Sequence, residues 1–328
     1  MINKLITFSL LSLSISVAWA DHPTDTIEKW LEKMHHAAHM LNYDGTFVYG
    51  QNNELSSMQI IHSVNADGEF ERLISLDGSG REVIRSGDTV TCILPDKKSV
   101  VVDKRAANEV FPPQFPLKID QLSDFYNFHL NGEARVAGQL AKKLVIQPKD
   151  KYRYGHTLWI DSKTGLLLKD HLIGEQGEIV EQFMFTQIKY PHKINKERFQ
   201  SDIKKEKFVW YKAKEPEVNN KVNQSMGWKV KYLPAGFVPG VERHHKMSMS
   251  AMPVEHFMFS DGLSSVSVFV EKQMNNTKNL IGGSKMGAIN AYGRAIGKYH
   301  VTVVGEVPQV TVKMVGDSVE QTNEHVKH

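Results

Sequence analysis

The sequence has one cysteine, a nearly even balance of charge and, after its first twenty residues, no apolar run long enough to cross a bilayer. Cys92 has no partner for an intramolecular disulfide. It stands in an alternating, strand-like segment, where a buried and inert thiol is commoner than a nucleophile. Forty Lys and Arg against 37 Asp and Glu give a net charge of +3, which is too even for a nucleic-acid reader. We therefore expect no disulfide and no nucleic-acid partner.

The first twenty residues have the features of a secretory signal peptide. Lys4 provides a basic start, Leu5 to Val17 is a short apolar stretch, and Ala18-Trp19-Ala20 has small residues at the two positions that a signal peptidase reads. We predict that residues 1–20 are removed and that a soluble, exported product begins at Asp21. A buried N-terminal helix is the alternative. The rest of the chain is longer than one core usually serves, which favours two domains.

The mature chain opens with a pattern typical of an amphipathic helix. Asp25 is a suitable N-cap, and Glu28 three residues later completes a capping box. Apolar residues then recur at steps of three and four: Ile27, Trp30, Leu31, Met34, Ala38 and Leu41. We predict a helix that packs one apolar face against a sheet.

Between Thr46 and Ile188 the apolar period changes to two, as in half-buried β-strands. Tight turn signals, among them Asp67-Gly68, Asp77-Gly78 and Asn131-Gly132, separate the alternating segments. Short turns of this kind join antiparallel neighbours. We predict an antiparallel meander that forms one long, strongly bent sheet with the first helix against it.

The clearest strand pair runs from Gly155 to Ile173, with Gly165 supplying the positive φ that its turn needs. Leu166, Leu167 and Leu168 are apolar in succession, which a sheet with one buried face does not require. We therefore predict a core on one face of this strand and an apolar cavity on the other.

Prolines interrupt the strand pattern between Lys104 and Asp124, where the chain reads Phe111-Pro-Pro-Gln-Phe115-Pro. Proline removes donors from a strand ladder, so this segment is predicted to be a loop. Phe111 and Phe115 are placed to lie over the open face of the sheet. A lid and a passive crossover both fit this pattern.

The composition changes after Tyr211, where Lys212 to Gln224 is charged, polar and without apolar periodicity. We predict a first domain of residues 21–211, a linker of residues 212–224 and a second domain of residues 225–320. A linker of this composition predicts a modest, polar contact between the domains and relative movement.

Short strands and two helices are predicted in the second domain. Val266, Val268 and Val270 alternate with polar residues and share one strand face. Ser284 can cap a helix whose apolar face would consist of Met286, Ile289, Tyr292 and Ile296. A second helix is predicted around residues 310–319.

Three segments of the second domain carry a family resemblance. Residues 260–270 read Ser-Asp-Gly-Leu-Ser-Ser-Val-Ser-Val-Phe-Val, Gly287-Ala288 follows, and residues 303–308 read Val-Val-Gly-Glu-Val-Pro. These resemble the C-terminal domain of the MucB/RseB family, and the hairpin of residues 155–173 resembles lipoprotein-carrier-type half barrels. The resemblance covers essentially the whole mature chain. It implies an α+β fold of two domains: an antiparallel half barrel with a packed helix, then a small α+β domain.

The resemblance also implies a function. Members of this family are periplasmic negative regulators of the sigma-E-type envelope stress response. They bind the periplasmic region of a membrane-spanning anti-sigma factor (RseA or MucA), shield it from the site-1 protease, and release it on lipid or lipopolysaccharide signals. A periplasmic carrier of lipid or lipoprotein is the alternative, because it needs the same apolar concavity. Neither function implies a cofactor.

Aromatic and apolar residues on the strands and loop are the candidates for lining this concavity. Their side chains adapt to acyl chains or to peptide anchors, although plain core packing against the first helix is the competing interpretation for each. The candidates are Phe47, Tyr49, Phe111, Phe115, Trp159, Leu168, Phe183 and Phe185.

Candidates for catalysis are weak. His35 and His39 lie four residues apart on one helical face, but no Glu stands between them as in a His-Glu-x-x-His motif, and no third ligand is evident. Gly282-Gly283-Ser284-Lys285 lacks the spacing of a phosphate-binding loop. We predict a binding protein rather than an enzyme and no metal site, with an exported hydrolase as a third hypothesis.

Overall fold

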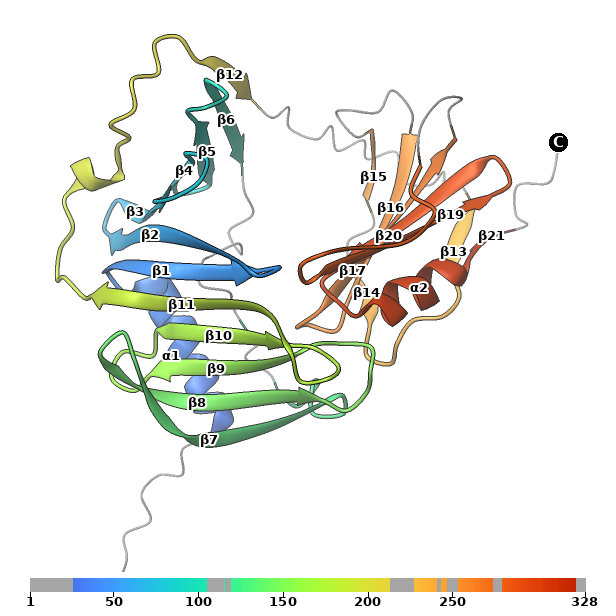
Figure 1. Ribbon diagram of the computed structural model, residues 1–328, viewed down its shortest axis with the longest axis horizontal. Helices are drawn as coiled ribbons and strands as arrows, with labels where there is room; N and C mark the ends of the chain where they lie inside the picture. The colour runs from blue at the N-terminus through green and yellow to red at the C-terminus, as the bar shows by residue number, and fades with distance from the viewer. Residues whose placement is uncertain are drawn as a thin grey trace, which may run out of the picture.

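The computed structural model describes residues 26–104, 115, 119–212, 227–240, 243–246, 253–273 and 279–322. Over these residues the chain is mostly β-sheet, with two α-helices, α1 and α2. A twelve-stranded sheet forms the first part, and a seven-stranded and a two-stranded sheet form the second (Figure 1). The expected two-part layout is present, but helices contribute less than an α+β description suggests.

Helix α1 spans Ile27–Met40, and its buried side chains are Trp30, Leu31, Met34, Ala37 and Ala38. The predicted apolar stripe is therefore confirmed. The N-cap is Thr26, whose hydroxyl accepts a hydrogen bond from the backbone N–H of Lys29. The predicted cap, Asp25, lies outside the described residues.

The large sheet is an antiparallel meander, as predicted. Its order is β12-β6-β5-β4-β3-β2-β1-β11-β10-β9-β8-β7, and only the β12–β6 pair is parallel. The strands are β1 Tyr43–Gln51, β2 Glu54–Asn65, β3 Gly68–Ser75, β4 Glu82–Ser86, β5 Thr89–Leu94, β6 Ser99–Lys104, β7 Tyr126–Val136, β8 Gln139–Pro148, β9 Gly155–Asp161, β10 Leu167–Ile173, β11 Ile179–Lys189 and β12 Val209–Lys212. Helix α1 lies behind β8–β11 in Figure 1 and shares one core with them.

One predicted turn is wrong. The β7–β8 hairpin reverses at Ala137-Gly138, where both residues have positive φ (47° and 80°), as a two-residue type I′ turn requires. Gly132, with φ 70°, instead lies at a register shift between Leu130 and Glu133. The Asn131-Gly132 signal therefore marks a β-bulge inside one long strand, because a left-handed glycine serves a bulge as well as a turn.

The β9–β10 hairpin confirms the predicted strand pair, and Gly165 has φ 86°. The three leucines at residues 166–168 are all at most 1 % exposed and all belong to the same core around α1. A register shift between Leu167 and Lys169 allows successive residues to contact that core. The leucine run therefore does not require an apolar cavity on the second face.

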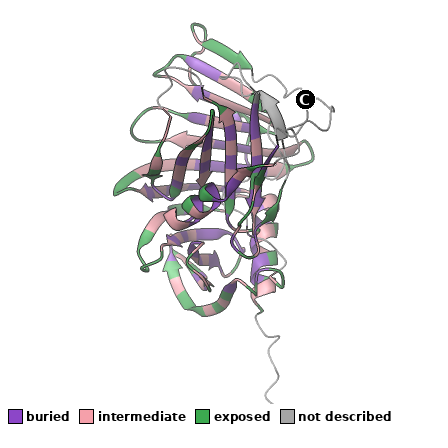
Figure 2. Cartoon of the chain, turned by 90° about the vertical axis from the view of Figure 1, so that its right-hand side faces the viewer, coloured by how far each residue is buried: buried purple, intermediate pink, exposed green. Residues whose placement is uncertain are grey.

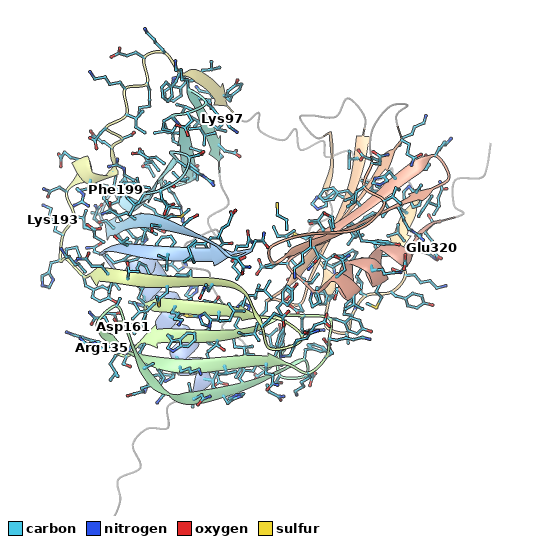
Figure 3. All side chains as sticks on the ribbon, viewed as in Figure 1. Lys97, Arg135, Asp161, Lys193, Phe199 and Glu320 are labelled. Carbon is cyan, nitrogen blue, oxygen red and sulfur yellow. The ribbon has the colours of Figure 1, made fainter. Side chains whose placement is uncertain are left out.

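A segment after β11 covers the outer face of the sheet. It includes the short 3-10 helix η1 (Lys196–Phe199), and Phe199 lies beside β2 and β3 in Figure 3. Phe199 and Ile194 pack with Ile61 of β2, and Arg72 of β3 donates a hydrogen bond to the carbonyl of Arg198. The outer face of these strands is therefore buried by the chain itself.

The second part contains the seven-stranded sheet, with order β14-β16-β17-β20-β19-β18 and β15 paired to β16. Val266, Val268 and Val270 are 0 % exposed, which confirms their shared buried face, and buried and intermediate residues alternate along the strands in Figure 2. The elements are β13 Trp228–Val230, β14 Val238–Pro239, β15 Arg243–Lys246, β16 Pro253–Ser260, β17 Ser265–Lys272, β18 Gly282–Met286, β19 Ile289–Ile296, β20 Tyr299–Gly305, α2 Gln309–Asp317 and β21 Val319–Gln321. The helix predicted around residues 310–319 is confirmed as α2.

The helix predicted from Ser284 is wrong, because this segment forms the β18–β19 hairpin. Gly287 has φ 62° and is the first residue of the two-residue turn, where a type II′ hairpin turn needs glycine. Pairing of β19 with β20 continues the sheet. The apolar residues recur at steps that suit a helix, but long-range strand pairing prevails over this short local pattern.

Candidate binding site at the domain junction

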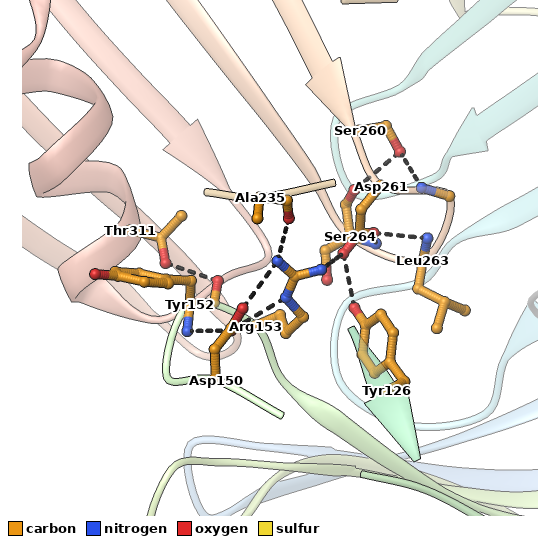
Figure 4. A network of polar contacts seen from close by, with 11 residues as sticks. Tyr126, Asp150, Tyr152, Arg153, Ala235, Ser260, Asp261, Leu263, Ser264 and Thr311 are labelled. Atoms are coloured by element: carbon orange, nitrogen blue, oxygen red, sulfur yellow. Dashed lines mark hydrogen bonds and ion pairs between the residues drawn. The ribbon is translucent and has the colours of Figure 1, made fainter. Parts of the chain in front are cut away.

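An ion pair buried between the two domains fixes their junction (Figure 4). The Arg153 guanidinium donates to Asp261 Oδ2 at 2.7 Å, and both side chains are fully buried. The Tyr126 hydroxyl donates to the same carboxylate oxygen at 2.9 Å. The other oxygen, Oδ1, accepts hydrogen bonds from the backbone N–H groups of Leu263 and Ser264. Asp261 is therefore held by its own turn and aimed at the first domain.

Arg153 is equally constrained. It also pairs with Asp150 at 3.0 Å and donates to the Ala235 carbonyl at 2.6 Å. Its guanidinium lies 5.0 Å from the ring centroid of Phe125 and 5.3 Å from that of Phe237. Because its donors meet acceptors from both domains, this residue ties the twelve-stranded sheet to the second domain.

Further contacts extend the junction. The Asn290 side-chain amide donates to the Tyr154 hydroxyl at 2.9 Å, and the Thr311 hydroxyl donates to the Tyr152 carbonyl at 2.7 Å. Tyr154, Leu172 and Ala288 form a small apolar cluster across the interface. The contact is thus more extensively buried than the predicted modest, polar one.

A cavity of about 210 Å³ lies at this junction. The first domain contributes most of its lining and the second adds Leu263 and Glu306. The residues of the first domain are Tyr49, Phe115, His156, Asp170, Leu172, Glu181, Gln182 and Phe183. The cavity has apolar walls and a band of ionisable groups across β9, β10 and β11.

The ionisable groups of the cavity perturb one another. Glu306 is accessible to solvent, yet desolvation by the surrounding protein, with the Glu181 carboxylate adding to it, raises its pKa to about 7. Desolvation also raises the pKa of Glu181. Burial opposes a charge on His156, but Asp170, 3.2 Å away, outweighs it, so the His156 pKa is raised. The cluster therefore holds protons more readily than separate residues do in water.

A second depression, of about 450 Å³, borders the junction at the surface. It lies between the β1–β2 turn, the β10–β11 hairpin and residues Lys285 and Gly287 of the second domain. We call it the rim groove. Leu55 and Ile179 line it and are 66 % and 49 % exposed, and Met286, next to it, is 64 % exposed. Exposed apolar side chains gathered at a groove are typical of binding surfaces.

The structure separates the sequence-predicted candidates into groups. Phe47, Phe185 and Leu168 are at most 1 % exposed and belong to the core around α1. Tyr49, Phe115 and Phe183 line the junction cavity. Phe111 lies outside the described residues. Whether any of them contacts a ligand stays a prediction.

Trp159 is partly buried and packs against the core around α1. Strand alternation puts it on the opposite face of β9 from the fully buried Leu158 and Ile160. Its ring lies between the ammonium groups of Lys143 and Lys169, at 5.5 and 4.5 Å from its centroid. Trp159 is not among the residues that line the junction cavity, and a contact with a ligand stays a prediction for it as well.

Sequence reasoning missed the junction residues. Asp261 and Glu306 stand inside two of the motifs that carried the family resemblance, so their position was a usable signal. Arg153, by contrast, lies in a charged turn with no distinguishing pattern. Its burial depends on a partner 108 residues further along the chain.

The candidate metal ligands and the single cysteine lie outside the junction. The rings of His35 and His39 are 4.8 Å apart on α1, and no cluster of three possible metal-ligating side chains occurs among the residues described. Cys92 is partly exposed on β5 rather than buried. Within the described parts of the chain, no helix is both long and apolar enough for a transmembrane span.

Comparison with known proteins agrees with this architecture. Residues 26–203 match the MucB/RseB N-terminal domain and residues 222–320 match the MucB/RseB C-terminal domain. The chain is 32 % identical to the sigma factor AlgU regulatory protein MucB of Pseudomonas aeruginosa, over 95 % of this chain and 97 % of that protein. It is 26 % identical to the sigma-E factor regulatory protein RseB of Haemophilus influenzae, over 96 % and 98 %.

A solved structure agrees as well. The crystal structure of MucB in complex with MucA(peri) superimposes with a TM-score of 0.69 at 29 % identity, covering 90 % of this chain and 99 % of that one. Both domains and their order along the chain are thus shared with these regulators, and the chain belongs to the MucB/RseB family.

Proposed function

We propose that this protein is a periplasmic negative regulator of a sigma-E-type envelope stress response. It binds the periplasmic region of a membrane anti-sigma factor of the RseA/MucA type and shields that region from site-1 proteolysis. The similarity to MucB, solved as a complex with MucA(peri), over nearly the whole chain carries this proposal. The proposal includes export directed by a signal peptide of residues 1–20. It also includes a first domain of residues 21–211, a linker of residues 212–224 and a second domain of residues 225–320, as predicted from the sequence.

The junction supports this function. A binding protein needs a preorganised surface, and the Arg153–Asp261 pair holds two sheets on either side of the rim groove. The groove exposes apolar side chains of the first domain and is also lined by Lys285 and Gly287 of the second, so a segment seated there contacts both domains. Binding across two domains makes affinity depend on their relative position.

Titration with the purified periplasmic region of the cognate anti-sigma factor tests the proposal. We expect a dissociation constant of about 1 µM or tighter, and absence of binding at about 100 µM would refute it. A second assay incubates the membrane anti-sigma factor with the site-1 protease. The protein should slow its cleavage, and adding lipid or lipopolysaccharide should restore it.

An apolar row on the inner face of the large sheet favours a second function, carriage of lipid or lipoprotein. Ile60, Leu73, Val83, Cys92 and Val101 are direct neighbours across β2 to β6. All but Ile60 are partly exposed. This row could hold acyl chains in a lipoprotein-carrier-like half barrel. Native mass spectrometry distinguishes the two: stoichiometric lipid kept through purification, without affinity for the anti-sigma factor, favours the carrier.

A further inference from the structure

Among the described residues, strand β18 leaves one edge of the seven-stranded sheet unpaired. It is the last strand in the sheet order, and within these residues its one strand partner is β19. Residues 283–286 are all exposed. Sheet edges of soluble proteins are usually protected by several charged residues, bulges or covering segments. Lys285 is the one charged residue of this strand, so charge protects its edge only weakly. It is therefore a template for strand addition.

The hairpin turn shows which backbone groups face the free edge. In a two-residue turn the flanking residues, Met286 and Ile289, form a hydrogen-bonded pair. Antiparallel pairs alternate between hydrogen-bonded and non-hydrogen-bonded, so Lys285, paired with Asn290, is of the second kind. The N–H and C=O of Lys285 therefore point away from β19, and the same alternation turns those of Gly283 outward.

This edge is continuous with the rim groove. Lys285 lines the groove, and Ile281 and Met286 at the two ends of β18 are 68 % and 64 % exposed. On the opposite wall, Leu55 and Ile179 offer apolar contacts. A chain paired with β18 would direct alternate side chains toward these residues.

The charge of the groove indicates what the added strand should carry. Glu54 and Glu178 line it, and neither forms an ion pair within the described residues. Lys285 is the one basic residue of the lining. The groove is therefore net acidic, and a basic side chain on the incoming segment complements it.

We infer that the free edge of β18 is the docking strand for an extended peptide that carries alternating apolar side chains and a basic residue. The peptide pairs with Gly283 and Lys285 through main-chain hydrogen bonds. Its apolar side chains lie between Leu55 and Ile179. This inference rests on the proposed function, which identifies the peptide with a segment of the anti-sigma factor.

Two variants at one position test this mode of binding. Lys285→Pro removes an outward N–H and places a ring at the edge, while the β18–β19 hydrogen bonds of the neighbouring residues stay intact. Lys285→Ala removes the side chain and keeps the N–H. In titrations of the full chain with the periplasmic region of the anti-sigma factor, we expect Lys285→Pro to weaken binding about tenfold or more, and Lys285→Ala to change it less than about threefold.

Amide hydrogen exchange of the unaltered protein provides a measurement that does not depend on how the proline variant folds. The Lys285 and Gly283 amides should become protected when the anti-sigma segment is added. Equal affinities of the two variants, or unchanged exchange at these amides in a complex that does form, would overturn the docking mode. Failure of the unaltered protein to bind the segment would instead overturn the proposed function.

Discussion

Replacing Asp261 by Asn removes the charge that faces Arg153 at the junction. The substitution preserves side-chain shape, and Oδ1 can still accept from the backbone of its own turn. The amide N–H₂ that replaces Oδ2 then faces two former donors, Arg153 and the Tyr126 hydroxyl. A buried guanidinium is left without this counterion.

Breaking a buried pair by removing one partner typically costs about 3–5 kcal/mol, because the remaining charge is desolvated and unpaired. Asp150 still pairs with Arg153, at 3.0 Å, so we expect a cost of about 3 kcal/mol, the lower end of that range. The control is Glu320→Gln, which breaks the exposed Lys229–Glu320 pair of 3.1 Å. Exposed pairs contribute about 1 kcal/mol or less.

The free energy of unfolding of both variants is measured by chemical denaturation monitored through tryptophan fluorescence. Trp30 lies in the first core and Trp228 in the second, so the signal reports on both domains. Arg153→Met combined with Asp261→Leu should recover much of the loss, because an apolar pair needs no counterion. If Asp261→Asn costs no more than Glu320→Gln, the junction is not held by this ion pair, and the argument for a fixed domain arrangement fails.

Three further substitutions probe other parts of the molecule. Phe185→Asp should unfold the protein rather than selectively abolish a lipid response, because the residue is 1 % exposed; circular dichroism that stays native would contradict this. Glu306 has a raised pKa, so the folded protein should lose stability as the pH rises from about 4.5 to about 7, and Glu306→Gln should flatten this dependence in denaturation midpoints measured across that range. Gly165→Ala should lower stability by about 1 kcal/mol or more, since φ is 86° and the new Cβ would lie 2.6 Å from the Lys33 carbonyl oxygen; an unchanged melting temperature would refute this.

Local sequence patterns predicted the elements whose periodicity is long and unambiguous. The stripe on α1 and the valine alternation on β17 each repeat several times, so one secondary structure satisfies them. The β18–β19 segment shows the limit. Met286, Ile289 and Tyr292 suit a helix, but the same apolar residues also fit two strands on either side of Gly287. Sheet pairing with β20 selects between the two.

The candidate site was predicted less well than the fold. Sequence spacing does not distinguish the aromatic residues of a core from those that line a cavity. The structure places Phe47 in the core and Phe115 at the cavity. The rim groove has no local signature, because its residues come from three hairpins that are far apart in the chain.

Amino-acid order was sufficient for the meander, the first helix and the family motifs, because period, capping and turn chemistry act between residues that are close in the chain. It was not sufficient for the junction. Nothing local in the sequence pairs Arg153 with Asp261, and the burial of their side chains depends on the contacts that each makes across the junction. An ion pair between residues 108 positions apart depends on how the two sheets pack against each other, and no local sequence pattern carries that information.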